Sequence, residues 1–191
     1  MAASAPATPV RHLPGQASMW FFVLGDLWIF ICYFACYVFA RGRHAEAFLQ
    51  GQHQLHQGLG VLNTVVLLTS SLFVALCVQA ARAGDFIPAS RFAALGGGCG
   101  VLFIAIKACE WTMTVSAGFA PGSDDFFLYY FMLTGLHVVH VTLGLGILAL
   151  MWRELRAKQQ PHAALVETGA IYWHLVDLLW IAIFALLYLA R

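Results

Sequence analysis

Five long apolar stretches dominate this 191-residue chain and limit what it can fold into. A helix needs about 20 consecutive apolar residues to cross about 30 Å of hydrocarbon, and each stretch is long enough. They cover residues 17–40, 58–81, 92–117, 126–152 and 169–190. Hydrophobic residues make up 61% of the chain and charged residues only 10%, whereas soluble domains are roughly a quarter charged. The sequence therefore predicts an all-α membrane protein, a bundle of five transmembrane helices.

The segments outside these stretches are short. Residues 1–16 are rich in Ala and Pro, which predicts a flexible N-terminal tail. The first apolar stretch is too long for the core of a signal peptide, so we expect it to remain in the membrane. Residues 17–191 then form a single transmembrane domain, because the polar connectors leave no room for a separate soluble one.

The Lys and Arg residues of the short connectors predict the orientation, since they accumulate on the cytoplasmic side. With the N-terminus inside, six of them lie on the inner side: Arg11, Arg82, Arg91, Arg153, Arg156 and Lys158. Three lie outside: Arg41, Arg43 and Arg191. This asymmetry favours an N-terminus in and a C-terminus out.

Ionisable residues inside the apolar stretches are expensive, at about 2.5 to 3.5 kcal/mol each near the bilayer centre. The first stretch contains Asp26, which has no basic partner in its own span and must be protonated, paired with another helix or exposed to an internal cavity. The later stretches contain three pairs at a spacing of three residues, which places each pair on one helix face. The pairs are Lys107/Glu110, His137/His140 and His174/Asp177.

Two interpretations of these pairs compete. His and carboxylate side chains are common metal ligands, so a metal or proton site could lie where the last three spans converge. Alternatively the pairs form a structural polar network that fixes helix register. The second span adds a polar seam able to hydrogen-bond across helices: Asn63, Thr64, Thr69, Ser70 and Ser71. Glycines of the third and fourth spans, including Gly96, Gly100 and Gly144, permit close helix approach.

The cysteine pattern and the net charge give no support for a disulfide framework, a zinc or covalent haem site, or nucleic acid binding. The five cysteines form no CxxC or CxxCH motif, which argues against a disulfide framework, a zinc site or covalent haem. The formal net charge of +1 gives no indication of nucleic acid binding.

Several strings nevertheless resemble the subunit III family of haem-copper (cytochrome c) oxidases. In chain order they are MWFFVLGDLWIF, NTVVLLTSS, KACEW, YYFMLTGLHVVHVTLGLGIL and ETGAIYWHLVDLLWIAIFALLY. The resemblance runs from about residue 14 to residue 189 and so covers nearly the whole chain. The His-xx-His and Tyr-Trp-His-xx-Asp patterns of the last two strings are its most specific parts.

The resemblance implies a helical bundle docked against the catalytic subunit I, without haem or copper of its own and with bound phospholipid in larger members. Those members have seven helices, and this chain is similar to a five-helix form. Many respiratory members have Glu at the position of Asp26, and Asp there, together with the short chain, is more similar to the nitric oxide reductase-associated accessory proteins. By position, Asp26 corresponds to the family's buried carboxylate. The family's recurrent polar positions, assigned to structure, lipid contact and proton-path support, correspond to Glu110, His137, His140, His174, Asp177 and the loop carboxylate Glu167.

We therefore predict a non-catalytic accessory component of a haem-copper oxidase or nitric oxide reductase complex, in respiratory electron transport or denitrification. It would span the bacterial inner (plasma) membrane and stabilise the catalytic subunit or its proton uptake, with no catalytic residue and no metal ligand.

One alternative is a haem b-binding electron carrier, with His137 or His140 and His174 as axial ligands. Another is a metal-dependent membrane enzyme built from Glu110 and the three histidines. An oxidase catalytic core is excluded, because two haems and a copper need more histidine ligands than the three histidines that the membrane spans contain.

Overall fold

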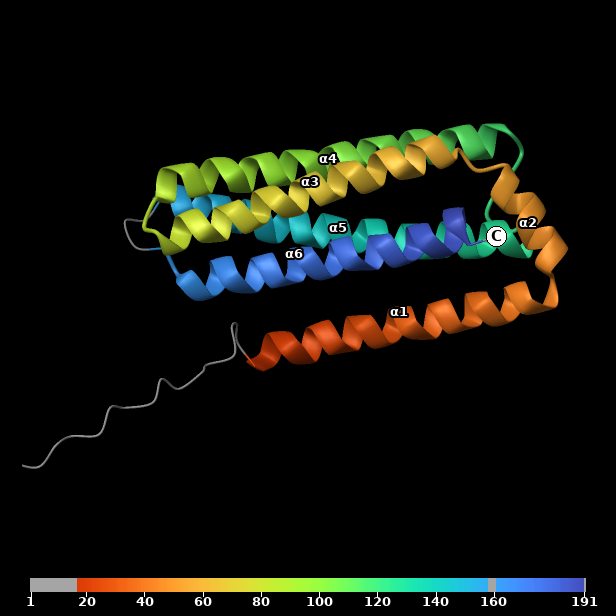
Figure 1. The fold of residues 1–191 in the computed structure, drawn as a ribbon, viewed down its shortest axis with the longest axis horizontal. Helices are drawn as coiled ribbons and strands as arrows, with labels where there is room; N and C mark the ends of the chain where they lie inside the picture. The colour runs from red at the N-terminus through yellow and green to blue at the C-terminus, as the bar shows by residue number, and fades with distance from the viewer. Residues whose placement is uncertain (1–16, 158–160, 191) are drawn as a thin grey trace, which may run out of the picture.

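The computed structural model describes residues 17–157 and 161–190, which are helical almost throughout (Figure 1). The helices are α1 (Ala17–Arg43), α2 (Ala45–His53), α3 (Gln57–Arg82), α4 (Phe86–Ser116), α5 (Asp125–Ala157) and α6 (Ala163–Phe184), followed by a π-helical turn, η1 (Ala185–Leu189). Five of them are long and apolar enough to cross a membrane, which confirms the predicted all-α bundle of five spans. The predicted tail of residues 1–16 lies outside the described residues, as do Lys158 and Arg191.

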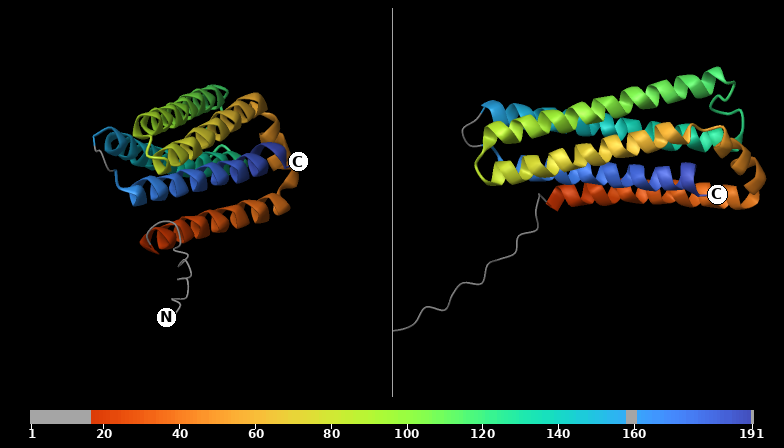
Figure 2. Two further views of the ribbon diagram at one scale, coloured as in Figure 1. Left: turned by 60° about the vertical axis from the view of Figure 1, so that its left-hand side comes forward. Right: turned by 45° about the horizontal axis from the view of Figure 1, so that its top comes forward.

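Four of the long helices pack around a common core, and α1 lies at the edge of the bundle (Figures 1 and 2). Helix α3 packs against α4 and α6, and α5 packs against the same two helices from the other side. Helix α1 touches α6 and α5 only sparsely, and the short helix α2 carries the chain from α1 across one end of the bundle. The described chain begins and ends at opposite ends of the bundle, as five spans require.

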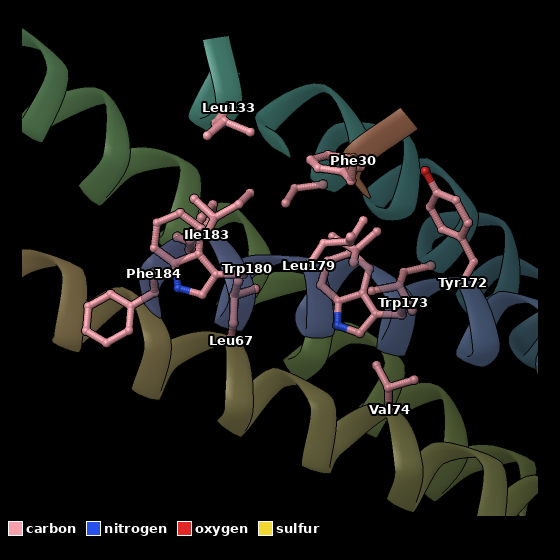
Figure 3. Close-up of a cluster of buried hydrophobic side chains, with 14 of the residues drawn as sticks. Phe30, Leu67, Val74, Leu133, Tyr172, Trp173, Leu179, Trp180, Ile183 and Phe184 are labelled. Carbon is pink, nitrogen blue, oxygen red and sulfur yellow. The ribbon is translucent and has the colours of Figure 1, made fainter. Parts of the chain in front are cut away.

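Helix α6 lies at the centre of the bundle. The evidence is that its large aromatic side chains Tyr172, Trp173 and Trp180 are all buried. Figure 3 shows Trp173 and Trp180 projecting from α6 among apolar side chains of the neighbouring helices. Small residues make room for them: a Cβ on Gly100 of α4 or Gly144 of α5 would lie 2.7 or 2.8 Å from the Trp173 ring. The glycines noted in the sequence therefore allow close approach at these two positions.

The helices extend beyond the predicted apolar stretches at several ends. The connector at residues 41–57 contains α2, whose Phe48 is buried against Tyr37 and Phe126. Helix α4 begins at Phe86, with Pro88 in its first turn, where a missing N–H is tolerated. Helix α6 begins at Ala163, so the prediction that Glu167 is a loop residue is wrong. Charged residues can continue a helix into the headgroup region, so an apolar stretch marks the membrane core better than it marks the helix ends.

Candidate functional site

A buried ion pair on α4 is the first of three polar groups inside the bundle. The Lys107 Nζ atom lies 3.0 Å from Glu110 Oε2, and the two side chains are only 1% and 0% exposed. The Lys107 ammonium also donates to the hydroxyls of Tyr188 (2.9 Å) and Tyr130 (3.3 Å). The Tyr188 hydroxyl in turn donates to Glu110 Oε1. The pair thus joins α4 to α5 and to the π-helical turn η1, and each charge is compensated where it is buried.

Aromatic rings enclose the same ammonium. Its Nζ atom lies 4.7 Å from the Tyr130 ring centroid, 5.2 Å from that of Trp180 and 5.4 Å from that of Tyr188. Such cation–π contacts stabilise a desolvated cation further. Tyr130 and Tyr188 were not among the predicted site residues, because nothing in the sequence shows which helices face Lys107.

The second group pairs Asp26 of α1 with His140 of α5. The His140 Nε2 atom lies 3.5 Å from Asp26 Oδ1, and the side chains are 12% and 11% exposed. The His140 Nδ1 atom lies 2.8 Å from the carbonyl oxygen of Leu136, to which it can only donate. A direct bond to Asp26 therefore requires a proton on either Nε2 or the carboxyl. Asp26, which has no basic residue in its own span, is thus paired with another helix.

The third group lies between α3 and α6. The Ser71 hydroxyl is 2.7 Å from His174 Nδ1, and Asp177 Oδ2 is 3.9 Å from the same nitrogen. Asp177 is buried, whereas the His174 side chain is 39% exposed. The group therefore has a buried carboxyl and an imidazole that reaches the outer surface of the bundle.

Indole N–H groups complete the contact between α3 and α6. Trp173 donates to Ser70 Oγ at 3.0 Å, and Trp180 donates to Thr64 Oγ1 at 3.0 Å. The Ser70 hydroxyl in turn donates a hydrogen bond to the Gly96 carbonyl oxygen of α4 at 2.7 Å. The predicted polar seam therefore bonds across helices at Thr64, Ser70 and Ser71. Thr69 instead bonds the Val65 carbonyl of its own helix.

His137 belongs to none of the three groups. It is fully buried, and its ring centroid lies 5.5 Å from that of Phe103 and 5.2 Å from that of Trp180. Neither ring nitrogen has a hydrogen-bond partner among the described protein groups. A buried water is the usual partner of such an imidazole.

The predicted single network is thus divided. Lys107 and Glu110 form one group, His140 joins Asp26 in a second, and His174 with Asp177 forms a third. Glu167, predicted to lie in a loop, lies on α6 and forms a salt bridge with Arg82 of α3 at 2.8 Å, at the surface. No three His, Cys, Asp or Glu side chains of the described residues lie close enough together to hold a metal ion.

Comparison with known proteins gives the family. The family model described as cytochrome c oxidase subunit III matches residues 15–190. The chain belongs to the cytochrome c oxidase subunit III family. This confirms the resemblance seen in the sequence strings, and with five spanning helices it makes the chain a multi-pass membrane protein.

Named members of the subunit III family are similar over most of the chain. Cytochrome c oxidase subunit 3 of Corynebacterium diphtheriae is 29% identical, covering 87% of this chain and 83% of its own length. A probable cytochrome c oxidase subunit 3 of Nocardia farcinica is 31% identical with the same coverage. A protein of Aeropyrum pernix named heme-copper oxidase subunit I+III is 28% identical over 91% of this chain, which corresponds to 22% of its own length.

Proposed function

We propose that this chain is a non-catalytic subunit of a respiratory haem-copper oxidase, held in a bacterial plasma membrane against the subunit that carries haem and copper. The observation that carries the proposal is the subunit III match over residues 15–190, nearly the whole chain. The Aeropyrum relative supports the contact, because its name joins subunits I and III in one chain.

The polar groups support a structural role in that complex. Asp26, Glu110 and His174 each contact a residue of another helix, so that α1 is linked to α5, α4 to the end of the last span, and α3 to α6. The bond from Lys107 of α4 to Tyr130 of α5 joins these pairs into one bundle. In a membrane no hydrophobic force drives helices together, so packing and polar contacts fix their arrangement. A rigid bundle of this kind can stabilise a catalytic subunit or its proton uptake.

The face between α3 and α6 is the docking face that we propose for the catalytic subunit. A groove of about 300 Å³ runs between these helices, and its walls include Ala75, Val78, Gln79, Ile171 and His174. His174 lies near the middle of the span Ala163–Leu189, so its exposed imidazole would meet hydrocarbon in an isolated chain. Because such exposure is costly, a polar group of a partner subunit suits this position.

A nitric oxide reductase is the second candidate partner, and Asp26 favours it, since many respiratory members have Glu there. Chain length no longer supports this branch. The matches cover 83% of the relatives' own length, so these relatives are comparable in length to this chain. They are named cytochrome c oxidase subunit 3 or probable cytochrome c oxidase subunit 3.

Purification in mild detergent tests the proposal. We expect the chain to co-purify with a haem-containing catalytic subunit and, once separated from it, to show no Soret absorption. The reaction of the captured complex, oxygen or nitric oxide reduction, then identifies the branch. One haem per isolated chain, abolished by His174→Ala, would instead establish an electron carrier.

Photo-crosslinking tests the docking face separately. A benzophenone side chain introduced at Ile171 should crosslink to the catalytic subunit, whereas one at Leu143, exposed on α5, should not. Crosslinking only from Leu143 would move the interface to α5 while leaving the subunit assignment intact.

A further inference from the structure

A small polar pocket opens at the end of the bundle that carries α2, and we call it the α2 pocket. Its volume is about 110 Å³, which leaves room for a few water molecules, since each occupies about 30 Å³ in the liquid. Its lining comprises Leu49, Gln52, His53, Leu55, Gln57 and Tyr188. Two amides and one imidazole among these six residues make water a better occupant than an apolar ligand.

Tyr188 forms the wall between the α2 pocket and the buried ion pair. The residue lines the pocket, although it is only 5% exposed. Its hydroxyl accepts a hydrogen bond from Lys107 and donates one to Glu110. A single side chain thus separates a pocket that water can enter from two buried charges.

Contacts with α1 and α2 hold this wall in place. The Gln52 Nε2 atom donates to the carbonyl oxygens of Leu186 (3.3 Å) and Ala190 (2.9 Å), which lie on either side of Tyr188 in the chain. The Tyr37 hydroxyl also donates to the Leu186 carbonyl, at 3.2 Å. Tyr188 itself belongs to the π-helical turn η1, and such turns occur frequently at functional sites. The buried Oε1 atom of Gln52 has no hydrogen-bond partner within the part of the chain that the structure describes, so it can accept a bond from water.

Asn63 lies one helical turn deeper on α3 than the contact with Tyr188. That contact is at Gly60, where an added Cβ would lie 3.0 Å from the Tyr188 ring. Gly60 and Asn63 share a helix face, because residues three apart are neighbours on an α-helix. Asn63 is fully buried, yet neither its Oδ1 nor its Nδ2 atom has a hydrogen-bond partner among residues 17–157 and 161–190.

His137 of α5 borders the same region. Its ring centroid and the Lys107 ammonium each lie 5.2 Å from the Trp180 ring centroid. Trp180 in turn donates to Thr64, the residue after Asn63. Both nitrogens of the buried His137 ring lack a partner among the described protein groups. Buried polar atoms almost always form hydrogen bonds, and water is small enough to supply them here.

The opposite direction along α3 offers no comparable opening to Asn63. One turn further, the buried face continues with the apolar Leu67, which is 1% exposed. The next buried residue on this face is Ser70, whose hydroxyl already bonds Trp173 and the Gly96 carbonyl. Water that reaches Asn63 therefore has its nearest polar entrance at the α2 pocket.

We propose that the α2 pocket is the entrance to a row of internal water sites. The row passes Tyr188 and supplies the hydrogen bonds that Asn63 and His137 lack. Its ligand is water, and its role is to keep polar side chains of the core bonded while the water exchanges with the aqueous phase at one end of the bundle. This inference rests on the fold of the chain alone and not on which catalytic subunit it accompanies.

Radiolytic hydroxyl-radical labelling of the full chain in mild detergent tests the water sites, because the radicals form from water bound beside a side chain. We expect oxidation of His137 after short X-ray pulses. Trp173 is the matched internal reference. It is equally buried, its ring reacts with hydroxyl radicals at least as readily, and its N–H is bonded to Ser70. Labelling of His137 no greater than that of Trp173 would overturn the proposal without any variant.

A variant that fills the α2 pocket tests the entrance. Gln57→Phe places a ring in the pocket, and Gln54→Phe is the matched control, since Gln54 is exposed and does not line the pocket. After rapid mixing with ¹⁸O-labelled water, we expect the heavy isotope on oxidised His137 at once in the native chain and in the control, and several-fold more slowly in Gln57→Phe. His53→Phe fills the same pocket from α2 and should act in the same direction if Gln57→Phe folds poorly. Equal exchange in all these chains would mean that water enters elsewhere, and no exchange in the native chain would mean that the water is sealed inside. Either result would contradict the entrance.

Discussion

The ammonium of Lys107 lies 3.0 Å from the carboxylate of Glu110, one turn further along α4, and neither side chain reaches the surface. Isolated, either charge would be very unfavourable at this depth. Their proximity, together with the hydroxyls of Tyr130 and Tyr188, turns two costly groups into a contact between three helical segments.

Removing one member of this pair should destabilise the bundle more than removing both. We expect Lys107→Met to lower the free energy of unfolding by about 3 to 5 kcal/mol, because it leaves the Glu110 carboxylate buried without a cation. The double variant Lys107→Met/Glu110→Leu should recover most of this loss, since buried ion pairs can be replaced by apolar side chains at little cost. Denaturant unfolding in detergent measures the cycle, and additive single effects would contradict the pairing.

Tyr188 should contribute through its hydroxyl and not only through its ring. Tyr188→Phe removes the acceptor for Lys107 and the donor to Glu110, so we expect a loss of about 1 to 3 kcal/mol. Tyr129→Phe is the matched control, because the Tyr129 hydroxyl forms no hydrogen bond among the described residues while its ring packs against Tyr37. Equal thermal shifts for the two variants would mean that the hydroxyl of Tyr188 contributes nothing.

Asp26 and His140 should behave as a pair that attaches α1 to the rest of the bundle. Asp26→Asn keeps a donor for His140 Nε2 and should change stability by less than about 1 kcal/mol. His140→Leu leaves the carboxyl without its partner and should cost about 1 to 3 kcal/mol. Because α1 packs only sparsely elsewhere, the loss should appear first as faster proteolysis between α1 and α2. Unchanged cleavage in His140→Leu would show that the pair does not hold α1.

The glycines of α4 and α5 should divide into two classes. In Gly100→Ala the new methyl would lie 2.7 Å from the Trp173 ring, and in Gly144→Ala 2.8 Å from it, so each should cost about 1 to 3 kcal/mol by overpacking. Gly97→Ala meets nothing within 4 Å and should be neutral or stabilising by up to about 1 kcal/mol, because Ala favours helix. Thermal midpoints in detergent separate the classes, and a destabilising Gly97→Ala would contradict this packing.

The sequence predicted the spans well and the grouping of their polar residues poorly, for different physical reasons. The membrane thickness sets the length of an apolar span, so the five spans could be predicted directly from the lengths of the apolar stretches. Helix α2 is short and polar, and it depends on Phe48 packing against other parts of the fold. The spacing of Lys107 and Glu110 placed them on one face, and that pair is present. Spacing along one helix says nothing about rotation toward a neighbour, so His140 meeting Asp26, and His174 meeting Ser71, could not be predicted.

The orientation of the bundle remains a prediction, and it rests on six Lys and Arg residues on one side against three on the other. The described ends lie at opposite ends of the bundle, so one connector fixes the orientation of every span. The exposed loop between α4 and α5 suits this test, and Ser123→Cys places a thiol in it. In intact cells we expect an impermeant maleimide to label this cysteine, because the loop lies outside when the N-terminus is inside. Ala83→Cys, in the turn between α3 and α4, is the matched control and should be labelled only after the membrane is opened. Labelling of Ala83→Cys alone in intact cells would reverse the orientation and place Arg91 and Arg156 on the outer side.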